Sequence, residues 1–61
     1  MTKAQIGRML IFLNEAAAQI DNARVVAINA ADPLTLTAIQ YLLGELVAEI
    51  NRLERLHRSA V

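Results

Sequence analysis

The sequence predicts an all-α protein, an antiparallel two-helix hairpin that self-associates. Three observations indicate this. Hydrophobic residues make up 56% of the 61 residues, and nearly all of them are Ala, Leu, Ile or Val, a composition typical of helix bundles. Long helical patterns lie on both sides of an Asp-Pro pair near the middle of the chain. A chain this short forms one domain at most, and by itself it buries too little surface to be more than marginally stable.

The first helix is predicted from residue 3 to residue 30. Thr2 and Gln5 have the spacing of a capping box, in which each side chain bonds to the backbone N–H of the other residue. Downstream, apolar residues recur every seven positions, as they do on the buried face of a helix. Two such series run along the predicted inner face: Ile6, Leu13, Ile20 and Ala27, and beside them Met9, Ala16, Ala23 and Ala30.

Residues 31 and 32 are predicted to form the turn, and a second helix to run from residue 33 to residue 58. Asp32 has the side chain of an N-cap, and Pro33 suits the first helical position, where no N–H is needed. The residue before a proline avoids helical dihedral angles, which places the break here. So short a connection favours antiparallel helices, and the chain is therefore one hairpin domain, residues 1–61.

The second helix repeats its apolar residues at heptad spacing, which predicts one buried face. Packing that face on the inner face of the first helix gives the expected core of the hairpin. The predicted core residues are Ile6, Leu13, Ile20, Leu36, Ile39, Leu43, Leu46, Ile50 and Leu53.

The first helix has more apolar surface than one partner helix can cover. Residues 9–13 and 25–28 are apolar in every direction around the helix. A helix that is apolar nearly all round is normally buried, and in a two-helix chain only another chain can bury it. We therefore predict a homo-oligomer, either a four-helix bundle or a larger helical assembly. Its interchain contacts are predicted at Ile11, Phe12, Val25 and Val26.

No pattern in the sequence predicts catalysis, a metal site or a cofactor. The chain has no Cys, and His57 is its one histidine. With Glu54 beside it, His57 still falls short of the three or four ligands that a metal site needs. Glu45 and Glu49 lie one helical turn apart on a face expected to be solvated, which does not suit general acid catalysis. We therefore expect a non-enzymatic protein without cofactors.

The charge balance favours protein partners over nucleic acid. Six basic residues offset six acidic ones, so no strong field attracts a polyanion. Arg52, Arg55 and Arg58 form the one basic cluster, but three Glu residues lie close to it in the sequence. Two alternatives to a structural subunit remain open. One is a small helical adaptor or chaperone that binds a partner helix. The other is a dimeric RNA-binding regulator, because Rop-like RNA-binding dimers have a similar hairpin architecture.

Neither a membrane span nor a signal peptide is predicted. The longest stretch without a charged residue is Pro33 to Gly44, which is much shorter than the roughly 20 residues of a transmembrane helix. The N-terminus lacks the basic, apolar and small-residue regions of a signal peptide. These patterns predict a cytoplasmic location unless a dedicated secretion system exports the chain.

A further pattern runs from Asp-Pro to the end of the chain. A Leu follows three residues after the proline, a Gln follows four residues later, and the chain ends in a basic and apolar run. The residues are Asp32, Pro33, Leu36, Gln40, Leu43, Glu45, Ile50, Leu56, Arg58 and Val61. This half of the chain resembles the C-terminal helix of needle and inner-rod subunits of type III secretion systems. It departs from that family at Leu46, where an aromatic residue is usual, and at Glu54 and Arg55, where small polar residues are usual. The resemblance implies a hairpin subunit that packs into a helical filament through heterologous contacts.

Overall fold

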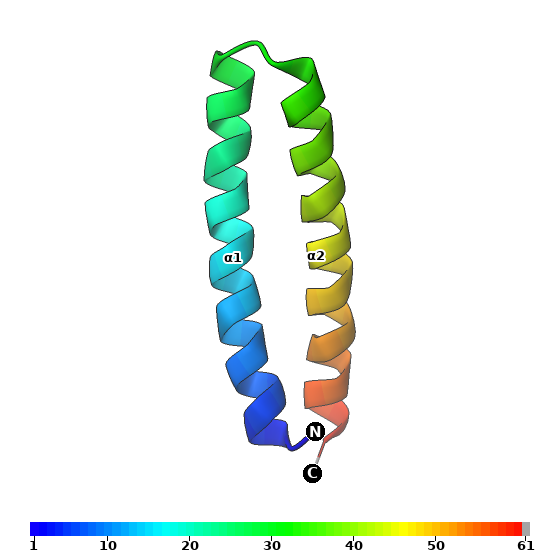
Figure 1. Ribbon diagram of the computed structural model, residues 1–61. Helices are drawn as coiled ribbons and strands as arrows, with labels where there is room; N and C mark the ends of the chain where they lie inside the picture. The colour runs from blue at the N-terminus through cyan, green and yellow to red at the C-terminus, as the bar shows by residue number, and fades with distance from the viewer. Residues whose placement is uncertain (61) are drawn as a thin grey trace.

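In the computed structural model, which describes residues 1–60, the chain forms a hairpin of two long helices (Figure 1). The first helix, α1, spans Lys3–Asn29, and the second, α2, spans Pro33–Ser59. The helices are antiparallel and lie side by side, so that the start of α1 lies near the end of α2. This confirms the all-α hairpin predicted from the sequence. The helix ends differ from the predicted bounds by one residue each, because α1 stops at Asn29 and α2 continues to Ser59.

The start of α1 is closed by the capping box expected from the sequence. The backbone N–H of Gln5 donates to Oγ1 of Thr2 at 3.1 Å, and the backbone N–H of Thr2 donates to Oε1 of Gln5 at 2.8 Å. Two N–H groups that have no partner within the helix are thereby satisfied.

The connection begins with a Schellman turn that ends α1. The N–H of Ala31 donates to the Ile28 carbonyl at 3.1 Å, and the N–H of Asp32 donates to the Ala27 carbonyl at 3.2 Å. Ala31 has a φ of 53°, in the left-handed region that glycine usually occupies at this position. This sharp reversal lets the chain leave α1 within two residues.

Asp32 also serves as the N-cap of α2. Its side chain accepts the backbone N–H of Thr35 at 3.1 Å and the Thr35 hydroxyl at 2.7 Å. The hydroxyl bond, and after it the backbone bond, lower the pKa of Asp32 because both favour the charged carboxylate. Pro33 follows at the start of the helix, where a missing N–H costs nothing. One residue therefore closes α1 and opens α2.

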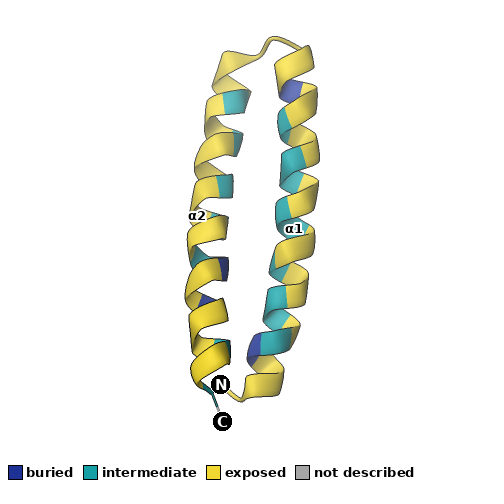
Figure 2. Ribbon diagram, turned by 180° about the vertical axis from the view of Figure 1, so that it is seen from behind, coloured by how far each residue is buried: buried dark blue, intermediate teal, exposed yellow. Residues whose placement is uncertain are grey.

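The core is a thin layer between the two helices. Figure 2 shows that the buried and half-buried residues lie on the sides where the helices face each other, and that the outer sides are exposed. Ile6, Ala27, Ile50 and Leu53 are buried, and only 2% of Leu53 is exposed. The remaining predicted core residues are half-buried: Leu13, Ile20, Leu36, Ile39, Leu43 and Leu46.

Near the turn, the inner face of α1 departs from the predicted heptad series. Ala23 and Ala30 are exposed, whereas Arg24 is half-buried. An α-helix with 3.6 residues per turn drifts by about 20° per heptad relative to a strict seven-residue repeat. Over three heptads this drift moves the later members of the Met9 series from the centre of the interface with α2 to its exposed edge. The two alanines therefore lie at the exposed edge of the interface between the helices, beside Thr35 and Ile39, and are not buried within it as expected.

Candidate assembly surface

The hairpin exposes more surface than a globular chain of its mass. Its accessible surface is 4497 Å², whereas a compact protein of 6.7 kDa is expected to expose about 3,900 Å². Large hydrophobic side chains contribute to this exposed surface along the length of the hairpin. They are Met1, Ile11, Phe12, Val25, Val26, Ile28, Leu34, Tyr41, Leu42, Val47 and Leu56.

The four residues predicted to make interchain contacts are all exposed, and they divide between two sides of α1. Phe12 and Val26 are 66% and 67% exposed and border depressions on one long face of the hairpin. Ile11 and Val25 precede them by one residue, which turns both side chains to the outer side of α1. The structure therefore does not gather the four residues into one patch.

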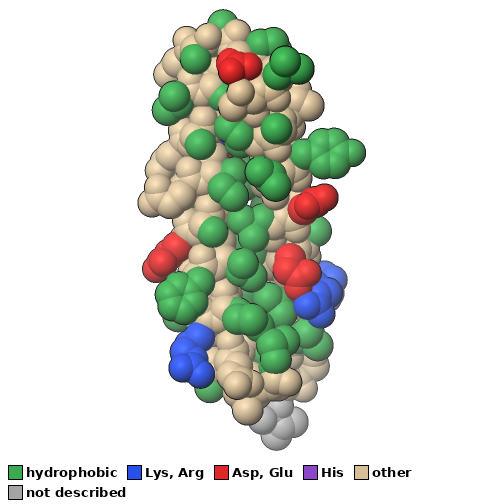
Figure 3. All heavy atoms as spheres, in the orientation of Figure 1, with side chains coloured by type: hydrophobic (Ala, Val, Ile, Leu, Met, Phe, Trp, Pro, Cys, Tyr) green, Lys and Arg blue, Asp and Glu red, His purple; other side chains and the backbone are tan. Residues whose placement is uncertain are grey.

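One long face of the hairpin is predominantly apolar, and we call it the groove face. Figure 3 shows hydrophobic side chains along the line between the two helices, with charged side chains at the margins. Three open depressions follow this face from the chain ends to the turn. The groove face comprises Met9, Phe12, Ala23, Val26 and Ala30 of α1 and Thr35, Ile39, Leu42 and Leu46 of α2. Polar residues also border its depressions: Gln5, Arg8, Asp32, Glu45 and Glu49.

The depression at the turn end of the groove face has a floor of small side chains. It measures about 390 Å³ and is lined by Ala23, Val26, Ala27, Ala30, Asp32, Thr35 and Ile39. The two polar residues at its edge, Asp32 and Thr35, already bond to each other. An apolar group can therefore enter the depression without separating these polar groups from their partners. The drift of the heptad positions brings Ala23 and Ala30 to this face. Their side chains are small, so they leave a hollow that a larger side chain would fill.

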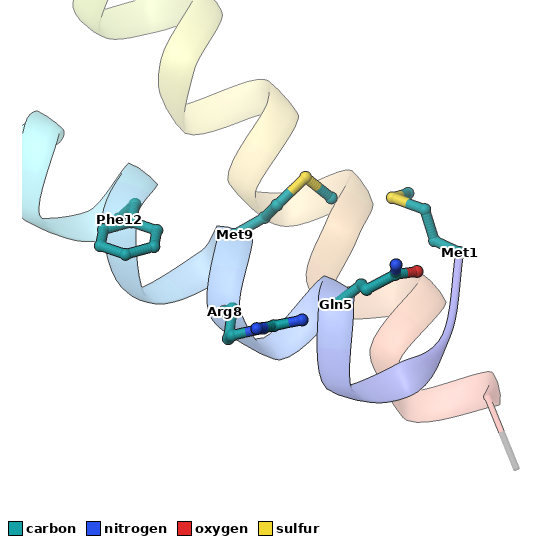
Figure 4. Close-up of a pocket in the computed structure, with 5 residues that line it drawn as sticks. All are labelled: Met1, Gln5, Arg8, Met9 and Phe12. Carbon is teal, nitrogen blue, oxygen red and sulfur yellow. The ribbon is translucent and has the colours of Figure 1, made fainter.

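The other end of the groove face is formed by larger side chains. Figure 4 shows Met1, Gln5, Arg8, Met9 and Phe12 along the first turns of α1, where they line a further depression. The side chains of Met1 and Met9 point toward each other, and Phe12 stands further along the helix. The groove face is thus hollow near the turn and has a projecting aromatic ring in its other half.

The ion pairs of the hairpin are local to each helix. Nε of Arg24 lies 2.8 Å from Oδ1 of Asp21, and Nε of Arg52 lies 2.8 Å from Oε1 of Glu49. The hydrogen bond from Arg52 lowers the pKa of Glu49, because it favours the carboxylate. Glu45 and Glu49 both line the middle depression of the groove face, and Glu49 is the one that is paired with Arg52.

The opposite long face is more polar, although it also has the exposed Ile28 and Val47 and a depression beside Pro33 and Leu36. Helical spacing places Asn14 and Asp21 of α1 on it, together with Asn51, Glu54 and Arg58 of α2. Burying these groups against an apolar partner would remove them from water at a cost. The groove face is therefore the better surface for a contact between proteins.

The residues considered for other chemistry are dispersed. His57 packs against Gly7 rather than beside other ligands. Within residues 1–60, no three His, Asp or Glu side chains are grouped closely enough to hold a metal ion. In the basic cluster Arg52 is paired with Glu49, whereas Arg55 and Arg58 are exposed.

No protein-family model, curated protein or solved structure matches this chain. In the part of the chain that the structure describes, neither helix combines the length and apolar character needed to cross a membrane. The functional interpretation therefore rests on the apolar surface and its geometry.

Proposed function

We propose that this protein is a non-enzymatic structural subunit that works by assembling with copies of itself. The observation that carries the proposal is the mismatch between a thin core and a large exposed apolar surface. Among residues 1–60 the buried ones are Ile6, Ala27, Ile50 and Leu53, while Phe12 and Val26 of the groove face remain 66% and 67% exposed. Contiguous exposed apolar surface of this kind is typical of interaction sites.

Stability supports the same proposal. A short chain without Cys has no disulfide to constrain its unfolded state, so packing must provide its stability. Association with another copy would bury part of the surface that the hairpin leaves exposed, and it would stabilise the folded state by mass action. Folding and assembly of this chain are then expected to be coupled.

The assembly can take one of two forms, a closed bundle or an open filament. The resemblance of the second half to needle and inner-rod subunits of type III secretion systems favours the filament. Open growth needs heterologous contacts, in which two different surfaces of the hairpin meet. The exposed Ile11 and Val25 on the outer side of α1 would provide a second apolar surface for such growth.

Sedimentation across a concentration series tests the proposal. The molar mass of the full chain is measured from low micromolar to about one millimolar, and helix content is followed by circular dichroism. We expect a mass of at least two chains at high concentration, with helix content rising as the chains associate. A folded monomer of 6.7 kDa throughout the series would overturn the proposal and favour an adaptor that binds a helix of another protein.

A further inference from the structure

We propose that two copies pack groove face against groove face, with their turns at opposite ends, and that Phe12 of each copy fills the alanine-lined depression of the other. This inference rests on the proposed function and selects the closed bundle over the open filament. The product is a closed four-helix pair with two-fold symmetry. Each copy contributes the same surface, as an isologous contact requires.

The size of the groove face fits a stable pair. The Cα trace of the hairpin extends over 47 × 15 × 13 Å, so the backbone alone outlines a long face of about 700 Å². A stable interface of standard size buries about 800 Å² on each partner. A second copy of this hairpin therefore matches the face in length and width, whereas a single partner helix would cover only part of its width.

The shape of the groove face determines the direction of packing. Phe12 projects from one half of the face, and the depression lined by Ala23 and Ala30 lies in the other half. A two-fold axis that lies in the interface and runs perpendicular to the helices places one half of the groove face against the other half of the partner's face. The Phe12 ring of each copy then meets the depression of the other. Both contacts form at once, because symmetry repeats the first contact at the other end.

The register of this packing also fits. If Phe12 lies opposite Ala23 of the other copy, the two-fold axis crosses α1 between residues 17 and 18. The middle of α1, Lys3–Asn29, is residue 16. The helices of the two copies are then offset by only about 4.5 Å at a rise of about 1.5 Å per residue. Filling the depression therefore keeps almost the whole groove face in contact.

The alternative symmetric pair, with both turns at the same end, fits less well. In the hairpin Gly7 lies level with His57, so Phe12 lies level with a point about five residues earlier in α2. With the turns together, α1 of one copy faces α2 of the other, and Phe12 would meet the ion pair of Glu49 and Arg52. The two alanine-lined depressions would face each other and stay unfilled, and unfilled space in an interface forfeits contacts.

Distance measurement between spin labels separates the two arrangements. The chain has no Cys, so Leu34→Cys provides a single labelling site, and Leu34 is 84% exposed beside the turn. With the turns at opposite ends, the two labels are expected on the order of 30 Å or more apart. With the turns together, they lie within about 25 Å of each other. The shorter distance would overturn the inference.

A pair of aromatic variants tests the role of Phe12. Phe12→Ala is expected to weaken the pair at least about tenfold, as the loss of a central aromatic anchor does. The matched control is Tyr41→Ala, because Tyr41 is as exposed as Phe12 but projects from the outer side of α2. The control should keep the dissociation constant within about twofold. Equal weakening by the two variants would contradict the proposed contact, and circular dichroism of each variant shows whether the hairpin has folded.

The sedimentation series distinguishes this inference from the proposed function. A mass that settles at two chains, together with the longer label distance, supports both. A mass that settles at two chains with the shorter distance, or a mass that grows beyond two chains, overturns the closed pair but leaves self-assembly standing. A monomer at all concentrations overturns both.

Discussion

The imidazole of His57 packs against the backbone of Gly7, where the start of α1 meets the end of α2. A methyl group on Gly7 would lie 3.5 Å from Nε2 and 3.9 Å from Cδ2 of His57. These are ordinary van der Waals distances, so the glycine leaves just enough room for one methyl group. His57 therefore covers this end of the hairpin as a packing residue, and the space at Gly7 can be tested directly.

Replacing Gly7 with Ala is expected to raise the free energy of unfolding by about 0.5–1 kcal/mol, because Ala has the higher helix propensity and its methyl group fits against His57. Gly44→Ala is the matched control, since Gly44 lies within α2 and a methyl group there would meet nothing within 4 Å. Urea unfolding at one fixed chain concentration measures both variants, because association makes stability depend on concentration. A lower stability of Gly7→Ala together with a higher stability of Gly44→Ala would show that the contact with His57 does not tolerate a methyl group at residue 7.

The left-handed residue in the turn gives a second prediction. Ala31 has a φ of 53°, a conformation that costs a residue with a Cβ about 1–2 kcal/mol. Ala31→Gly removes this strain but gives the unfolded chain more freedom, so we expect a net gain in stability of about 0.5–1 kcal/mol. Ala48→Gly, at an exposed position inside α2, should instead lose about 1 kcal/mol. Thermal unfolding of both variants checks the difference, and a loss in Ala31→Gly would contradict it.

The sequence predicts those parts of the fold that depend on local chemistry. Thr2 with Gln5 and Asp32 with Pro33 are recognisable because a cap uses side chains within three residues of the backbone group that they satisfy. The hairpin follows from these caps and from the heptad pattern of α2. The left-handed angle at Ala31 is not recognisable, since glycine is the usual signal for it.

The groove face depends on features that residue types do not reveal. Whether Ala23 faces α2 or solvent depends on how far the heptad positions have rotated around the axis of α1 at that point. A strict seven-residue repeat does not describe that rotation. The depression beside Ala23 and Ala30 therefore had no signal in the sequence beyond the alanines spaced seven residues apart. The exposure of Phe12 and Val26 could be predicted because both lie outside the single face of α1 that one partner helix covers.

The core depends most on residues that are nearly inaccessible. Leu53 is 2% exposed, so Leu53→Ala is expected to cost about 2–5 kcal/mol through lost contacts and the cavity that it leaves. Leu34→Ala removes the same atoms from a side chain that is 84% exposed, and it should change stability by no more than about 0.5 kcal/mol. Thermal melts by circular dichroism compare the two variants. Equal effects would mean that the hairpin interface contributes little to folding.

Acid is expected to weaken the hairpin partly through Asp32. The hydroxyl of Thr35, followed by its backbone N–H, holds the pKa of Asp32 below its ordinary value of 3.8. The folded chain therefore binds a proton at this carboxylate less readily than the unfolded chain does. The resulting stability is fully present above the ordinary pKa and is lost as the pH falls through the lower folded value. We expect the midpoint of thermal unfolding to be steady from about pH 7 to about pH 5 and to fall below about pH 4.

Two substitutions identify which carboxylates cause this acid loss. Asp32→Asn keeps a side-chain oxygen that can cap α2 but does not titrate, so it should reduce the loss. The pKa of Glu49 is lowered in the same direction by its hydrogen bond from Arg52, and Glu49→Gln should remove a further part. The double variant is therefore expected to have the flattest profile between about pH 5 and pH 2. If the double variant loses stability as steeply as the original chain, other carboxyl groups must bind the protons, and the hydrogen bonds to Asp32 and Glu49 would not be the source of acid sensitivity.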